Sequence, residues 1–83
     1  MATIDTVRQV LGDTLQLGAR AQRLMPETAL LGSMPELDSM AVVTVLTALE
    51  EAFGIYVADD EVSAETFETV GSLARFVDRK LAG

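Results

Sequence analysis

The sequence predicts an all-α fold, a bundle of three main helices plus one short helix, with a long loop between the first two main helices. Apolar residues recur at helical spacing in three stretches, and each stretch begins near a residue that commonly caps a helix. Proline and glycine interrupt the chain between the first two stretches. With 83 residues, 49% of them hydrophobic, and no cysteine, we expect residues 1–83 to form a single domain held by apolar packing.

The first helix is expected to run from Thr3, which can act as its cap, to about Gly18, where a glycine can stop it. Gly12 lies inside this stretch and lowers helix propensity by about 1 kcal/mol relative to alanine. We expect packing of the apolar stripe to offset that loss. The stripe consists of Ile4, Val7, Val10, Leu11 and Leu15.

Residues 19–37 are predicted to form the long connection. Pro26, Gly32, Ser33 and Pro35 punctuate this segment and argue against a continuous helix. It is too apolar for a free linker, so we expect it to lie across the helices with its apolar side chains held against the core. These side chains are Leu24, Met25, Leu30, Leu31, Met34 and Leu37.

A second helix is expected from Ser39 to about Phe53, with Asp38 as its N-cap and Gly54 at its end. Its stripe of Val42, Val45, Leu46, Leu49 and Phe53 should face the core. On the other side, Met40, Ala41 and Val43 leave the first turns almost free of charge. Either these residues form a patch that a partner covers, or the helix is buried most of the way round.

Two further helices are expected after Gly54. Asp59-Asp60-Glu61-Val62 can form the short one, and its three adjacent carboxylates lack the spacing and the glycine of a calcium loop, so we expect no specific metal site. Thr69 can cap the last helix, and the basic residues Arg75, Arg79 and Lys80 suit its C-terminal half. Its stripe consists of Val70, Leu73, Ala74, Val77 and Leu81.

Ser39 is the residue we expect to carry the chemistry. At the first position of a helix its hydroxyl faces solvent, and the free N–H groups and positive end of the helix stabilise an attached phosphate. The chain has no histidine or cysteine to activate a nucleophile, and Asp38 is better explained as a cap. Ser39 is therefore expected to be acted upon, and we do not expect an enzyme.

Two stretches resemble the centre of an acyl carrier protein. They are the run Leu37-Asp38-Ser39-Met40 and the end of the helix that follows it, Ala48–Ile55. The resemblance continues through residues 57–61 and 67–77, so it covers roughly the last fifty residues. In that family the serine after aspartate receives a 4′-phosphopantetheine arm from coenzyme A, and the arm's thiol carries cargo as a thioester. The resemblance thus implies attachment at Ser39, with Asp38 as helix cap and contact for the transferase.

The family resemblance also implies partners: a phosphopantetheinyl transferase, an enzyme that loads the acyl group and one that accepts it. We expect these partners to dock on residues near Ser39 and on the acidic side. Fatty acid synthase partners are in doubt, because Ala41 and Thr44 stand where many family members carry acidic residues, and the connection before Asp38 is longer than usual. The candidate docking residues are Met40, Val43, Glu50, Glu51, Asp59 and Asp60.

The cargo is expected to be an acyl group for lipid, polyketide or exopolysaccharide synthesis. The Asp-Ser-Met form is similar to D-alanyl carriers and to carriers of exosortase and exopolysaccharide systems, so an aminoacyl cargo remains an alternative, and a non-modified helical adaptor a further one. An aliphatic chain of medium length would gain about 0.8 kcal/mol per buried methylene between the second and third main helices.

Charge narrows the classes of partner. Residues 27–68 carry ten acidic residues and no basic one, and the net charge of the chain is −7. This distribution excludes a nucleic-acid binder and favours basic protein partners, although acidic surfaces also serve solubility. No signal peptide or transmembrane stretch is apparent, so we expect a cytoplasmic monomer without stable membrane insertion.

Overall fold

The computed structural model describes residues 2–82, except for the side chain of Asp59. Three α-helices dominate it: α1 (Thr3–Thr14), α2 (Ser39–Phe53) and α3 (Val70–Ala82). Short 3-10 helices η1 (Gly18–Arg23), η2 (Asp59–Glu61) and η3 (Ala64–Phe67) lie in the connections, and no strand forms within residues 2–82. The predicted all-α bundle is confirmed, and the predicted short helix between α2 and α3 forms as 3-10 turns.

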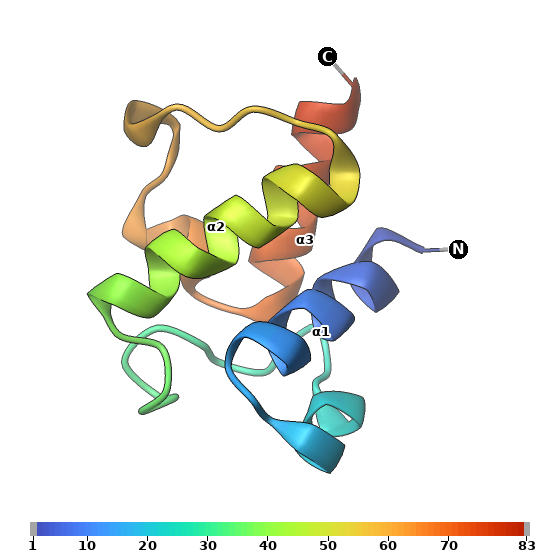
Figure 1. Cartoon of the computed structure of the whole chain (residues 1–83), viewed down its shortest axis with the longest axis vertical. Helices are drawn as coiled ribbons and strands as arrows, with labels where there is room; N and C mark the ends of the chain where they lie inside the picture. The colour runs from blue at the N-terminus through green and yellow to red at the C-terminus, as the bar shows by residue number, and fades with distance from the viewer. Residues whose placement is uncertain (1, 83) are drawn as a thin grey trace.

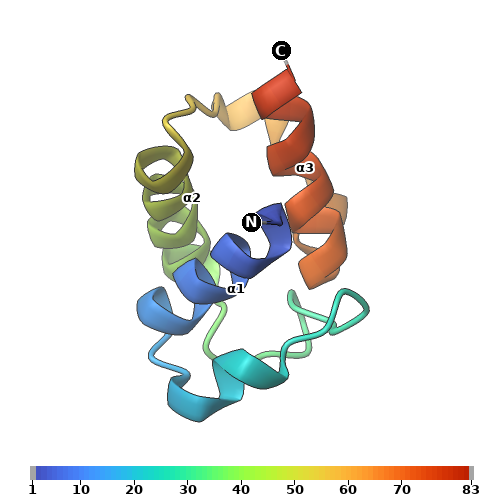
Figure 2. The same ribbon diagram turned by 90° about the vertical axis from the view of Figure 1, so that its right-hand side faces the viewer.

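Helix α1 is the centre of the packing, because it lies against both α2 and α3 (Figures 1 and 2). Val7 and Leu11 on α1 are fully buried, as are Val45 on α2 and Val77 on α3, and all four belong to one apolar core. Such complete burial of branched side chains supplies most of the driving force for a domain of this size. None of the helices described is long and apolar enough to cross a membrane.

The predicted ends of α1 are wrong at both termini. Ala2 is the N-cap, while the hydroxyl of Thr3, inside the helix, donates to Asp78 of α3. The helix ends four residues before Gly18, because Gln16 takes a left-handed conformation (φ 55°) and the Leu17 N–H donates to the Gly12 carbonyl at 2.9 Å. This is the hydrogen bond of a Schellman ending, which is usually built on glycine.

The long connection crosses the bundle as predicted, although not all its apolar side chains are buried. Leu24, Leu30 and Leu37 are at most 4% exposed and Met34 packs partly against the core, whereas Met25 and Leu31 are exposed. Leu30 N–H donates to the carbonyl of Glu68, and the Val70 N–H donates back to Thr28, both at 3.0 Å. The connection is therefore fixed to the start of α3.

Helix α3 begins with a reciprocal cap, which confirms the prediction for Thr69. The Ser72 N–H donates to the Thr69 hydroxyl at 3.0 Å, and the Thr69 N–H donates to the Ser72 hydroxyl at 2.9 Å. The predicted stripe is correct except at Leu81, which is 49% exposed because the last turn of α3 extends beyond α1 (Figure 2). Phe76, which the spacing did not select, is buried.

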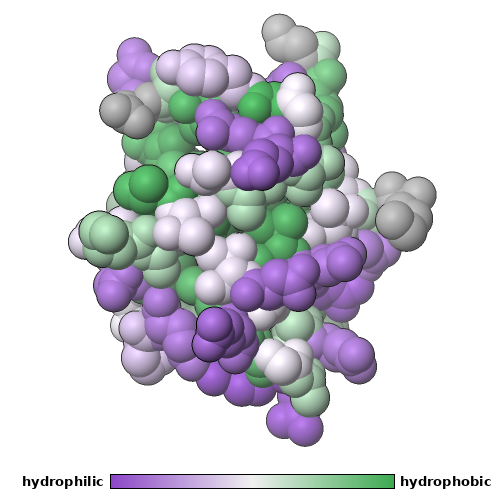
Figure 3. Space-filling view, in the orientation of Figure 1, coloured by the Kyte–Doolittle hydropathy of each residue, from purple (hydrophilic) through white to green (hydrophobic). Residues whose placement is uncertain are grey.

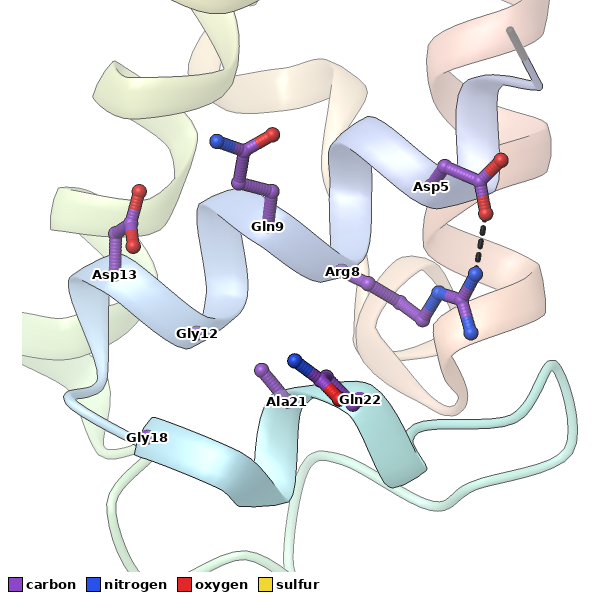
Figure 4. A pocket seen from close by; sticks show the side chains of 8 residues that line it. All are labelled: Asp5, Arg8, Gln9, Gly12, Asp13, Gly18, Ala21 and Gln22. Carbon is purple, nitrogen blue, oxygen red and sulfur yellow. Dashed lines mark hydrogen bonds and ion pairs between the residues drawn. The ribbon is translucent and has the colours of Figure 1, made fainter.

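At Gly12, α1 comes into close contact with η1 (Figure 4). A Cβ on Gly12 would lie 2.5 Å from the Cβ of Ala21, closer than two non-bonded carbon atoms can approach. The glycine therefore costs helix propensity but allows η1 to pack on α1. Sequence reasoning recognised the cost and missed this reason for it.

We expect Gly12→Ala to destabilise the protein by about 1–3 kcal/mol, as overpacking does, although helix propensity alone would favour alanine by about 1 kcal/mol. Urea denaturation measures the difference. The matched control adds Ala21→Gly, which removes the opposing methyl group and should recover part of the loss. A Gly12→Ala protein as stable as the wild type would contradict the close packing described above.

Candidate functional site

The candidate site lies at the N-terminus of α2, where the long connection ends. Asp38 has an extended backbone conformation, and its carboxylate oxygen Oδ1 accepts a hydrogen bond from the Ala41 N–H at 2.8 Å. The Val42 N–H donates to the Asp38 carbonyl at 2.9 Å and closes the first helical turn. Asp38 is thus the N-cap predicted from the sequence, and Ser39 is the first helical residue.

Ser39 is exposed, so its hydroxyl faces solvent. The N–H groups of Ser39 and Met40 have no acceptor among the residues described, as expected for the first turn of a helix. These two donors and the positive end of the fifteen-residue helix α2 create a favourable place for a phosphate ester on the Ser39 hydroxyl. The local geometry therefore fits a phosphate-linked group on this side chain.

The cap can be tested without changing the site's shape. Asp38→Ala removes the side-chain acceptor and should lower the free energy of unfolding by about 0.5–2 kcal/mol. Asp38→Asn keeps an oxygen in the same place, so we expect stability close to that of the wild type. Urea denaturation of the two variants checks this. Equal destabilisation by both would show that the carboxylate has another stabilising role.

The candidate docking residues fall into two groups. Met40 is 76% exposed and Val43 is 62% exposed, and Glu51 and Asp60 are exposed as well. The interpretation that α2 is buried most of the way round is therefore wrong. The side chain of Asp59 lies outside the described part of the structure.

Glu50 differs from the other candidates because its carboxylate has a structural partner. Its oxygen Oε2 accepts a hydrogen bond from the Val57 N–H at 2.8 Å, which fixes the start of the loop after α2. Nothing in the sequence distinguishes Glu50 from the neighbouring Glu51. The hydrogen bond to Val57 makes the Glu50 carboxylate less available to a partner.

A cavity between α1 and η1 is separate from this site. Its volume is about 480 Å³, and Gln9, Gln22 and the ion pair of Arg8 with Asp5 lie on its walls (Figure 4). Neither Ser39 nor a candidate docking residue lines it. Among the described residues no group of three or more potential ligands is placed to hold a metal ion.

An ion pair beside the site was missed by the sequence reasoning. Arg20 of η1 donates from Nη1 to Oε2 of Glu36 at 2.5 Å and from Nη2 to Oε1 at 3.4 Å. The hydrogen bonds from Arg20 hold the pKa of the Glu36 carboxyl below its usual range. Sixteen residues separate the two partners, a distance at which no local sequence pattern signals a contact.

Comparison with known proteins identifies the family of the chain. The family model described as "Phosphopantetheine attachment site" matches residues 5–77. The solution structure of a holo acyl carrier protein from Nitrosomonas europaea is 58% identical over the full length of both chains, with a TM-score of 0.92. A holo acyl carrier protein from Geobacter metallireducens is 27% identical over 99% of this chain and 88% of its own, with a TM-score of 0.78.

These matches define the class as that of carrier domains with a phosphopantetheine attachment site. The chain belongs to the acyl carrier protein family. It is a carrier and not an enzyme, its prosthetic group is covalently attached 4′-phosphopantetheine, and it works with enzymes as partners. The exposed hydroxyl and free N–H groups at the start of α2 suit this group.

Proposed function

We propose that Ser39 carries the 4′-phosphopantetheine arm, and that the protein, as one carrier domain over residues 1–83, presents an acyl thioester to partner enzymes. The observation that carries the proposal is the exposed Ser39 hydroxyl at the first position of α2, beside the free N–H groups of Ser39 and Met40. A phosphodiester there would be stabilised by the helix without a basic side chain.

The other serines support Ser39 by contrast. The hydroxyl of Ser72 donates to backbone carbonyls at 2.9–3.0 Å and accepts from the Thr69 N–H, so it is fully occupied. Ser63 is exposed, but the helix that it precedes, η3, has only four residues. Ser33 is exposed, but it lies in a turn without a helix N-terminus behind it. Among the serines within residues 2–82, only Ser39 combines an accessible hydroxyl with the positive end of a long helix.

Incubation of the unmodified protein with coenzyme A and a broad-specificity phosphopantetheinyl transferase tests the proposal. We expect the intact mass to increase by one phosphopantetheine group per chain. The Asp38→Asn protein should keep its stability but accept the arm more slowly, if the transferase contacts the carboxylate as the family resemblance implies. A wild-type chain that gains no mass would contradict the proposed function.

The outer stripe of α2, made of Met40, Val43, Thr44, Thr47 and Glu51, is the proposed docking surface. All five residues are exposed and share one face of the helix. The surface over the N-terminal half of α2 is accordingly mostly white to green, with little purple (Figure 3).

The two threonines make this stripe less polar than its sequence implies. Their hydroxyls donate to the carbonyls of Met40 and Val43, each at 3.1 Å, so both donors are already used within the helix. We propose that the partner enzymes, namely the transferase, the loading enzyme and the accepting enzyme, contact the first turns of α2 through apolar side chains. Glu51 and Asp60 would supply charge at the far end.

Met40→Ser tests the apolar contact. Truncating an apolar anchor residue of an interface weakens binding by about 1 kcal/mol or more, and Met40 is the proposed anchor, so we expect the KM of the transferase for the carrier to rise about fivefold or more. Met25→Ser is the matched control, because Met25 is also an exposed methionine but lies outside the outer stripe. Equal KM values for the two variants would contradict a docking role for Met40.

The cargo and its placement remain proposals as well. Leu49 of α2 and Leu73 of α3 belong to the core and are at most 1% exposed, so an aliphatic chain would enter between them by displacing side chains. Loading the modified protein with acyl and aminoacyl groups and measuring protection of each thioester from hydrolysis distinguishes the acyl cargo from the aminoacyl alternative. The cytoplasmic location stays a prediction from the sequence.

A further inference from the structure

The segment that leads into Ser39 is held at two points. Leu37, two residues before Ser39, is 4% exposed and belongs to the core. Between Leu30 and Leu37 the chain forms turns, in which the Leu37 N–H donates to the Met34 carbonyl at 3.0 Å. Pro35 lies exposed on the outside of these turns. Burial of Leu37 fixes how deeply the segment lies in the core. The position of the segment along the surface of the bundle is set by other contacts.

Glu36 makes the contact that restrains the segment along the surface of the bundle. Both of its carboxylate oxygens accept hydrogen bonds from the guanidinium of Arg20, which gives a fork-shaped pair with a defined direction. Such a pair restrains orientation more than a single contact does, because the carboxylate is held through both of its oxygens, at 2.5 and 3.4 Å. Glu36 is three residues before Ser39.

Arg20 can act as an anchor because η1 is itself fixed. The Arg20 N–H donates to the Leu17 carbonyl at 3.1 Å, and Leu17 and Leu24, on either side of η1, are each 4% exposed. Ala21 touches α1 at Gly12, where no Cβ intervenes (Figure 4). The position of η1 relative to α1 is thereby transmitted through Arg20 to the segment before Ser39.

We propose that Arg20 and Glu36 are positioning residues that orient the Ser39 end of α2 for transfer of the phosphopantetheine arm. This inference rests on the proposed function of Ser39. Exposed ion pairs contribute little to global stability, so the expected effect is on the transfer reaction more than on folding.

The experiment compares the transfer kinetics of the wild type with those of Glu36→Gln and Arg20→Gln. We expect either variant to raise the KM for the carrier about two- to fivefold, the range expected for loss of an exposed ion pair, with kcat unchanged. The transferase must then order the segment on binding, and once Ser39 is bound the chemistry is the same. The reversed pair, Arg20→Glu with Glu36→Arg, should restore most of the KM.

Glu61→Gln is the matched control. Glu61 also has both carboxylate oxygens bound by one basic side chain, Lys80 of α3, at 2.7 and 2.9 Å, but it lies away from the segment before Ser39. We expect its KM to equal that of the wild type even if its melting temperature falls as much as that of Glu36→Gln. At high salt the difference between the wild type and Glu36→Gln should shrink, because salt screens the pair.

Three results would overturn the inference. Glu36→Gln and Arg20→Gln could transfer like the wild type, or Glu61→Gln could slow transfer equally, which would indicate a general effect of charge or stability. In both cases a wild type that accepts the arm leaves the proposed function of Ser39 standing. A wild type that accepts no arm would overturn both.

Discussion

Ser39→Ala should abolish attachment of the phosphopantetheine arm, so its intact mass should stay unchanged after incubation with coenzyme A and the transferase. The alanine has no oxygen on which to form the phosphodiester, and no other serine in the described structure combines an accessible hydroxyl with the start of a long helix. The expected effect is complete loss of transfer, because the substitution removes the acceptor atom itself.

Ser33→Ala is the control for the Ser39 experiment. Ser33 is an exposed serine in the connection that ends at Ser39, and its removal should leave the mass gain complete. Both variants should unfold at nearly the wild-type urea concentration, since neither side chain is buried. Transfer to Ser39→Ala, or its loss in Ser33→Ala, would contradict the assignment of Ser39.

The second large effect is expected from Leu30→Ala. Leu30 is completely buried and holds the long connection against the core, so removal of its side chain should cost about 2–5 kcal/mol. The free energy of unfolding of a small domain is about 5–15 kcal/mol, and a domain of this size lies near the low end. The substitution should therefore remove a large part of the total stability. Urea denaturation followed by circular dichroism measures the change.

Leu31→Ala provides a control of the same chemistry one residue away. Leu31 is 43% exposed, and we expect a change within about 0.5–1 kcal/mol. The contrast between the two leucines tests the structure of the connection directly. If Leu31→Ala were as damaging as Leu30→Ala, the connection would lie against the core in a different way from that described.

Both ends of α2 and the start of α3 could be predicted because local residues set them. Asp38 and Thr69 accept hydrogen bonds from the N–H groups three residues later, and Gly54 takes the left-handed conformation (φ 65°) that ends α2. Each signal acts within one turn of helix, so it is visible in the sequence. The position of Ser39 at the start of α2 depended on the same local signal and could be predicted for that reason.

The end of α1 could not be predicted in this way. Gln16 adopts a left-handed conformation that costs a non-glycine residue energy, and burial of Leu15 and Leu17 on either side accompanies it. Gly18, expected to end the helix, instead begins η1. Tertiary packing thus decided where this helix stops, against local preference.

The connection between α1 and α2 shows the same limit. Leu30 and Leu31 are adjacent and chemically identical, and hydrogen bonds of the segment to Phe67 and Glu68, which are distant in the sequence, hold it with Leu30 facing the core. The pairing of Arg20 with Glu36 depends likewise on where η1 lies. Apolar composition predicted that the segment packs on the bundle but not which residues do so.

The most direct test of the central claim is fragmentation mass spectrometry of the protein isolated from its native cells. The account predicts a single phosphopantetheine group on the peptide that contains Asp38 and Ser39, with the fragment ions placing the added mass on Ser39. A free thiol and an acylated thiol are both consistent with this result. A group on any other serine, or an unmodified Ser39 in all molecules, would contradict the account.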